Sequence, residues 1–221
     1  MLRPTPGALN SQRLEERPAN LPTQLYVCGG RPASRFSAVV LEPDGPRLVG
    51  LDHPQDLQGL RQQGLPIWLR VSGLTDSQGI GRFLAVLDVP ETLLPPLLEA
   101  PQRPRVNCFG DALLVVLHRL SFAHDPSHLV SSQVGLLLRP DLLISFEEVS
   151  IGEAFPELTS WLYSRYAAPE HQDLDDILHF LIDEILDGLF PMLEQISNRL
   201  DSLEEAALRD PKPKLLSRAF V

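Results

Sequence analysis

Ten acidic side chains lie between Asp173 and Glu205, and five of them have a spacing suited to binding a metal ion. Asp176, Asp183, Asp187, Glu194 and Asp201 are separated by 7, 4, 7 and 7 residues, which places them on one face of a helix. Mg²⁺ prefers oxygen ligands, keeps several waters and often uses only one or two carboxylates. The row is therefore a candidate site for a hard cation, and the alternative is the solvated face of an amphipathic helix.

The histidines and the common catalytic motifs give weaker indications. His124 and His128 flank Asp125 in "HDPSH", but no third transition-metal ligand lies nearby in the sequence. We expect His118 to be hydrogen-bonded at the end of an apolar strand and His179 to pack within a helix. The chain has no GxSxG, HExxH, GxxxxGK[ST] or GxGxxG motif, so we predict no catalytic residues. A soluble metal-dependent enzyme stays the alternative, and it would need a convergent cluster of His, Asp and Glu.

Composition narrows the range of partners. The net charge is −10, from 19 basic and 29 acidic residues, which argues against nucleic acid because its binding depends on Lys and Arg. Cys28 and Cys108 are far apart and lie in apolar, strand-like runs, so we expect two buried, inert thiols. No run of about 18 apolar residues is present, so the sequence predicts no membrane span within these 221 residues.

Three regions follow from the pattern along the chain. Residues 1–23 form a Pro- and Arg-rich tail without apolar periodicity, 24–168 an α/β domain, and 169–221 a long helical segment. Strands are predicted in "QLYVCGG", "SAVVLEP", "PRLVGL", "PIWLRVSGL", "RPRVNCF", "DALLVVLHRLSF", "SSQVGLLLR" and "LLISFEE". The last three are apolar on both faces, so we expect a mixed β-sheet with helices on both faces.

Helices are predicted in "TDSQGIGRFLAVLDV", "PETLLPPLLEA" and "GEAFPELTSWLYSRY", and a longer one begins near Asp173. Its leucines and isoleucines recur every three or four residues from Leu174 to Leu203, interrupted by Gly188 and Pro191. Pro191 predicts a kink. A helix of about 35 residues is about 50 Å long, so we expect it to leave its domain and meet another helix or another subunit.

Four stretches, in order, resemble the CorA-type divalent-cation (Mg²⁺/Co²⁺) transporters, a family with a zinc-transporting branch. They are "WLRVSGL" at 68–74, "QRPRVNCFGDALLVVLHRL" at 102–120, "SSQVGLLLRPDLLISFEE" at 131–148 and "DDILHFLIDEILDGLFPMLEQISNRLDSLEEAAL" at 175–208. The resemblance covers about residues 65 to 210.

The resemblance implies a function and a setting. It implies the N-terminal cytoplasmic domain of a homopentameric transporter of the cell inner membrane, followed by a stalk helix and two membrane helices with a Gly-Met-Asn signature. We expect the natural polypeptide to continue beyond Val221 into those helices, since no polar tail or capping glycine follows Leu215. A regulatory Mg²⁺, with Co²⁺ or Zn²⁺ as alternatives, is the implied cation. A soluble oligomeric scaffold of the same fold is a further alternative.

The resemblance also implies ligands for that cation between neighbouring subunits. Asp183 matches a carboxylate of the family's site, whereas Pro95 and Pro96 stand where relatives carry acidic residues. Glu91 or Glu99 is a candidate substitute. With Asp176 and Asp187 from the acidic row, the predicted metal ligands are Asp183, Asp187, Asp176 and Glu99.

A charged corner follows the helix predicted in "PETLLPPLLEA". Pro104 stands between Arg103 and Arg105 and favours an extended entry into the next strand. We interpret the corner as a surface that a neighbouring subunit's acidic helix meets; the alternative is a structural corner whose arginines pair locally.

Overall fold

The structure, a computed structural model, describes residues 33–99, 102–122, 129–148, 155–164 and 173–209. Seven strands of the described chain form one sheet, in the order β2-β1-β3-β7-β6-β5-β4. They are β1 (Arg35–Glu42), β2 (Gly45–Leu51), β3 (Ile67–Ser72), β4 (Arg105–Phe109), β5 (Ala112–Phe122), β6 (Leu129–Arg139) and β7 (Leu142–Glu147). β3 and β7 pair in parallel and the other neighbours are antiparallel, so the predicted mixed sheet is confirmed. The predicted tail, the predicted strand at 24–30, Cys28, His124 and His128 lie outside the described residues.

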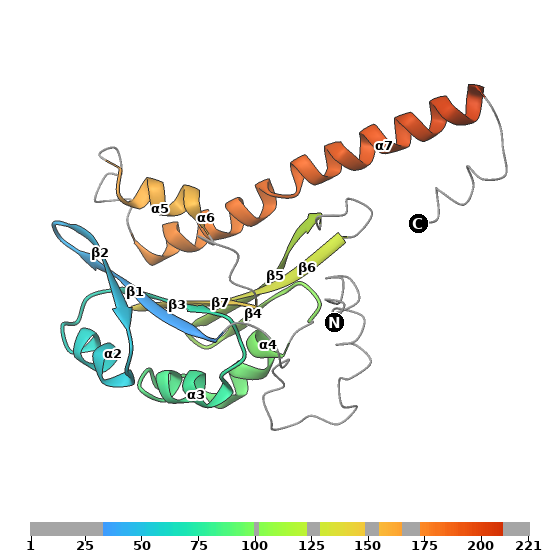
Figure 1. Ribbon diagram of the computed structural model, residues 1–221. Coiled ribbons are helices and arrows are strands. Elements are labelled where there is room, and N and C mark those ends of the chain that lie inside the picture. Colours follow the sequence, from blue (N-terminus) through green and yellow to red (C-terminus); the bar gives the residue numbers. More distant parts are fainter. Residues whose placement is uncertain (1–32, 100–101, 123–128, 149–154, 165–172, 210–221) are drawn as a thin grey trace.

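Helices cover both faces of this sheet, as the doubly apolar strands predicted (Figure 1). One face carries α2 (Pro54–Arg61), α3 (Ser77–Ala85) and α4 (Leu94–Leu98), which a short 3-10 helix, η1 (Glu91–Leu93), precedes. The other face carries α5 (Pro156–Leu162) and α6 (Leu174–Asp187). Two separate clusters of buried apolar side chains result, one on each side of the sheet. α2 was not predicted, because only Leu57 and Leu60 of its eight residues are buried and a two-residue stripe gives little periodicity.

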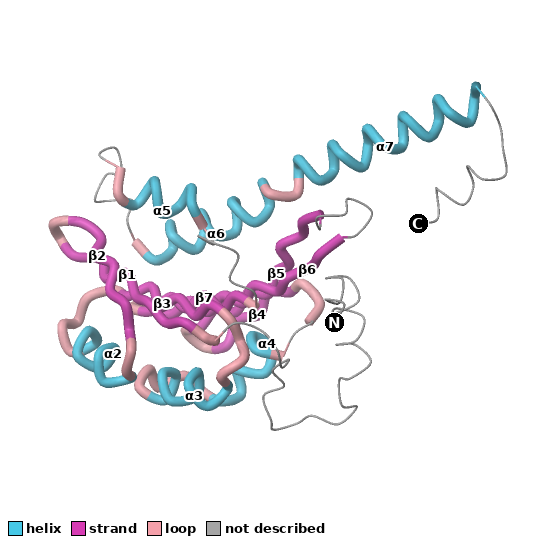
Figure 2. The backbone as a smooth tube through the Cα atoms, viewed as in Figure 1, coloured by secondary structure: helices cyan, strands magenta, loops and turns pink. Residues whose placement is uncertain are grey.

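The predicted interruption of the long helix is confirmed. α6 ends at Asp187, and α7 (Phe190–Arg209) begins after Gly188 and Leu189. α7 projects away from the sheet (Figures 1 and 2). Met192 is its buried residue, whereas Phe190, Leu193, Leu200 and Leu208 are all more than half exposed. A helix of 20 residues extends about 30 Å at 1.5 Å per residue, so most of α7 lies beyond the layers that form the core.

The prediction for Cys108 was wrong. Its thiol is free and exposed, because β4 is the edge strand and all five of its residues are exposed. The sequence "RVNCF" has the apolar content of an inner strand, but nothing in it distinguishes an edge position from a central one. Val106 and Phe109 are exposed for the same reason.

Replacing Gly135 with alanine should destabilise the protein by about 1–3 kcal/mol, the usual cost of overpacking a filled core. A Cβ at this β6 position would lie 2.9 Å from Cδ2, 3.1 Å from the carbonyl oxygen and 3.2 Å from Cα of Leu97 in α4. The backbone of α4 would then have to move. Gly59→Ala is the matched control: an added Cβ there meets nothing within 4 Å, and alanine favours a helix over glycine. Urea unfolding should show a lower free energy of unfolding for Gly135→Ala and a higher one for Gly59→Ala. Equal stabilities would contradict the close approach of β6 to α4 at Gly135.

Candidate metal-binding surface

The carboxylates of α6 lie where a cation from solution can reach them. Asp183 and Asp187 are exposed and Asp176 is half-buried. Nδ1 of His179 lies 3.1 Å from a carboxylate oxygen of Asp183, one helical turn away. The prediction that His179 packs was therefore wrong: the ring is 73% exposed, and it gives Asp183 a neighbour that can also bind transition metals.

Glu99 lies apart from this group. It follows α4 on the opposite face of the sheet and is only 6% exposed, whereas Glu91, at the start of η1, is exposed. Within one chain the sheet therefore separates Glu99 from the α6 carboxylates. In the part of the chain that the structure describes, no three His, Cys, Asp or Glu side chains come close enough to hold a metal ion. A site that combines α6 with the α4 side would need two chains.

Glu184 fixes the angle at which α6 meets α5. Its carboxylate accepts a hydrogen bond from the backbone N–H of Leu158 (3.0 Å) and another from that of Glu157, in the first turn of α5. Burial raises the pKa of Glu184, and these two N–H groups oppose that rise. Because Glu184 follows Asp183 directly, this interhelical cap also positions the candidate ligand. Sequence reasoning counted Glu184 only among the acidic residues, since nothing local signals a cap between two helices.

A buried polar network holds the corner that precedes β4. The side-chain oxygen of Gln133, on β6, accepts from the backbone N–H of Gln102 at 2.7 Å, and its Nε2 donates to the carbonyl of Leu97 at 3.1 Å. Nε2 of His118 donates to the Gln102 carbonyl at 2.6 Å, so Nδ1 accepts from the hydroxyl of Ser131 at 2.9 Å in the neutral ring. The prediction that His118 is hydrogen-bonded is confirmed. The buried Gln133 was missed, although a polar residue in an apolar run was the available signal.

The two arginines of the corner are exposed, and neither Arg103 nor Arg105 forms an ion pair with another described residue. The alternative of local pairing therefore has no support in the described part of the chain. Among the described residues, the corner places two positive charges beside β4, the last strand of the sheet.

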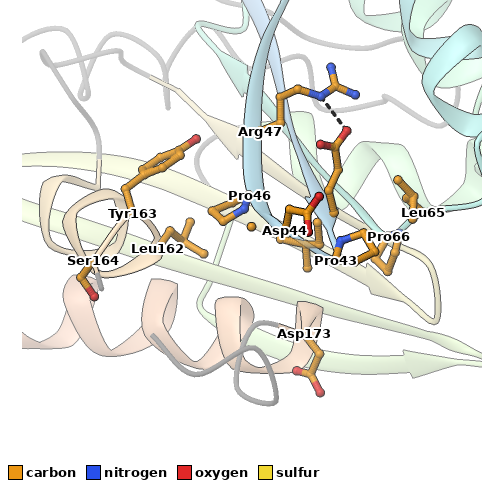
Figure 3. Close-up of a pocket in the computed structure, with 13 residues that line it drawn as sticks. Pro43, Asp44, Pro46, Arg47, Leu65, Pro66, Leu162, Tyr163, Ser164 and Asp173 are labelled. Carbon is orange, nitrogen blue, oxygen red and sulfur yellow. Dashed lines mark hydrogen bonds and ion pairs between the residues drawn. The ribbon is translucent and has the colours of Figure 1, made fainter. Parts of the chain in front are cut away.

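A cavity with a volume of about 800 Å³ lies between the β1–β2 turn, Pro66, the end of α5 and Asp173 (Figure 3). Arg47 and Glu42, two of its charged lining residues, are paired at 2.7 Å. Among the described residues of the lining, no hydrogen bond joins the hydroxyl of Tyr163 or Ser164 to a carboxylate.

Residues 64–220 match the sequence profile of the family described as CorA-like Mg2+ transporter protein, well over half of the chain. This chain belongs to that family. The cobalt/magnesium transport protein CorA of Thermotoga maritima is 27% identical to it over 158 residues, which are 72% of this chain and 45% of that protein. The chain thus spans less than half the length of this curated relative. The CorA family is one of transporters, which agrees with the prediction that the chain is not an enzyme.

Several solved structures share the fold. The soluble domain of CorA from Methanocaldococcus jannaschii has a TM-score of 0.56 at 17% identity, over 84% of this chain and 68% of that one. The cytoplasmic domain of ZntB from Vibrio parahaemolyticus has a TM-score of 0.57 at 17% identity, over 76% of this chain and 64% of that one. Full-length CmaX has a TM-score of 0.56 at 19% identity, over 86% of this chain and 58% of that one. The sheet with two helical layers and a projecting helix is therefore the fold of CorA-family soluble domains. No helix within the described residues combines the length and the apolar character needed to cross a membrane.

Proposed function

We propose that this chain is the cation-sensing, gating domain of a CorA-like divalent metal-ion transporter, on the cytoplasmic side of the cell inner membrane. Mg²⁺ is the principal cation, and Co²⁺ and Zn²⁺ are the alternatives. The observation that supports this most directly is the position of Asp183 and Asp187: both are exposed on α6, which leads within two residues into the projecting α7. A cation held by α6 acts on the helix that would carry the signal out of the domain.

The cation binds between chains in this proposal. The α6 carboxylates and the α4 side of the sheet lie on opposite faces, so a second copy supplies the other ligands, with Glu91 more accessible than Glu99. Arg103 and Arg105 give that second copy's acidic α6–α7 face a positive surface to meet. The assembly is a homopentamer in the full-length protein. A cation bound more tightly in one arrangement of subunits shifts the equilibrium toward it, by no more than the difference between its two affinities.

Mg²⁺ at about 10 mM should raise both the Tm and the sedimentation coefficient of the 221-residue chain, since a ligand that binds only the native assembly stabilises it by about 2.7 kcal/mol at 100 times its Kd. The double variant Asp183→Asn, Asp187→Asn should lose most of that response. Asparagine keeps the size of each side chain and removes the charge that binds Mg²⁺. Differential scanning fluorimetry and sedimentation velocity, with and without Mg²⁺, measure the two effects.

Asp175→Asn is the control, because Asp175 is exposed on the same helix but lies outside the acidic row. It should respond to Mg²⁺ as the wild type does. Assembly that increases with protein concentration but ignores Mg²⁺, Co²⁺ and Zn²⁺ would reject the sensor and favour a scaffold. A stronger response to Co²⁺ or Zn²⁺ than to Mg²⁺ would identify the site as one for a transition metal. The imidazole of His179 beside Asp183 is a suitable ligand for such a metal.

A further inference from the structure

A buried carboxylate lies under the α5–α6 layer without a hydrogen bond or an ion pair to another described residue. Glu147, the last residue of β7, is 1% exposed, and neither of its carboxylate oxygens has a hydrogen-bond partner in the described structure. It shares the face of β7 that carries Leu143, which packs in the cluster beneath α5 and α6. Ser145 lies on the same face of β7, and its hydroxyl accepts a hydrogen bond from Nε1 of Trp68, a member of that cluster. Leaving an ionised carboxylate unpaired in such a place is costly, and buried groups usually respond by taking up a proton.

The charged groups around Glu147 come from three elements. Arg70 on β3 and Arg119 on β5 lie close enough to favour the ionised form, and Glu184 on α6 opposes it. Arg70 lies over the ring of Trp68 at 5.0 Å, and its buried Nε has no hydrogen-bond partner among the described residues. Arg119 lies over the ring of Phe155 at 4.6 Å. β6 contributes the apolar Val134 opposite Glu147.

The helical layer adds two groups farther out. Glu157 of α5 is exposed, and Tyr163, just after α5, is about half exposed and has a pKa raised by burial.

The guanidinium groups of Arg70 and Arg119 make a metal cation at Glu147 unfavourable, and the burial of Glu147 leaves no room for larger ligands. A proton is the ligand that fits.

We propose that Glu147 is a proton-operated latch: the neutral carboxyl lets the α5–α6 layer close on the sheet, and loss of the proton loosens that layer together with the α7 helix it carries. The argument for the latch does not depend on whether a cation binds at Asp183. It would make the position of the projecting helix sensitive to the pH of its compartment.

The pH range of the latch follows from the environment of Glu147. Burial raises its pKa from 4.5 to about 7, more than Arg70 and Arg119 lower it. Between these two values the native state holds a proton that the unfolded chain has released, so stability falls as the pH rises through this range. Below pH 4.5 Glu147 is protonated in both the native and the unfolded state. Above pH 7 the native state carries the full free-energy cost of the ionised carboxylate. From pH 5.5 to pH 8 this one group should raise the unfolding equilibrium constant on the order of 30-fold.

Urea unfolding of the 221-residue chain at pH 5.5 and pH 8 tests the latch. Glu147→Gln mimics the neutral carboxyl, so it should remove that roughly 30-fold loss and be more stable than the wild type at pH 8. Arg70→Gln removes a positive neighbour and should move the wild-type transition to higher pH. Glu204→Gln, at an exposed position on α7 outside the acidic row, should leave the pH dependence unchanged. A Glu147→Gln chain that keeps the wild-type pH dependence overturns the proposal.

Hydrogen exchange in the unsubstituted chain gives a second test that needs no variant. After correction for intrinsic rates, amides of α5 and α6 should lose protection at pH 8 relative to pH 5.5, while those of α2 and α3 keep theirs. Equal behaviour of the two helical layers would overturn the latch.

Discussion

Replacing Trp68 with alanine should lower the free energy of unfolding by about 3–5 kcal/mol, the usual cost of removing a large buried aromatic side chain. Trp68 is fully buried in the cluster beneath α5 and α6. Its Nε1 donates to the hydroxyl of Ser145 at 3.0 Å, and its ring lies edge-on to Phe155 at 6.4 Å. Alanine would leave a large cavity and a buried hydroxyl without its donor.

The second tryptophan provides the control. Trp161 is half-buried on α5, and its ring packs at a tilt against Phe180 of α6 with 4.3 Å between the ring centroids. Trp161→Ala should therefore lower the free energy of unfolding by clearly less than Trp68→Ala. Urea unfolding followed by circular dichroism compares the two without depending on tryptophan fluorescence. A loss below about 1 kcal/mol for Trp68→Ala would mean that the site collapses around the smaller residue, and that Trp68 does not hold the α5–α6 layer in place.

The fold was largely predictable because its strongest signals are local. Residues 112–117 of β5 are apolar on both faces, and Gly110 takes the positive φ (61°) that the tight β4–β5 turn requires. The break between α6 and α7 followed from Gly188 and Pro191. Features that depend on position within the sheet were not predictable: Cys108 was expected to be buried, because the sequence of a strand does not reveal that it lies at the edge of the sheet.

The candidate site was predictable only in part, for a related reason. Asp183 and Asp187 were found from helical spacing and from the family resemblance, and the structure places both at the surface. Glu184 and Glu147 have their roles through partners more than twenty residues away, which no spacing rule detects. The pairing of the α6 carboxylates with ligands from a second chain stays a prediction.

Gln133→Leu should destabilise the protein by about 2–5 kcal/mol, because each buried polar group left without a partner costs about 1–3 kcal/mol. Leucine has a similar size but offers no hydrogen bond. The N–H of Gln102 and the carbonyl of Leu97 would both lose the partner that Gln133 supplies at 2.7 and 3.1 Å. Gln58→Leu, at an exposed position of α2, is the matched control and should change stability by less than about 0.5 kcal/mol.

The same substitution should act on the corner that leads to Arg103 and Arg105. Gln133 ties α4 and the start of this corner to β6, so its loss frees the segment that carries both arginines toward a neighbouring chain. Hydrogen exchange should therefore show lost protection in residues 94–98 and 102–109 of Gln133→Leu before the rest of the sheet opens. In the proposed assembly the variant would also associate less well, even under conditions where it is folded. If Gln133→Leu is as stable as Gln58→Leu and keeps its protection in these residues, the hydrogen bonds of Gln133 do not hold the corner. The geometry that α4 offers to a second chain is then set by the apolar packing of its buried residues, Leu94, Leu97 and Leu98.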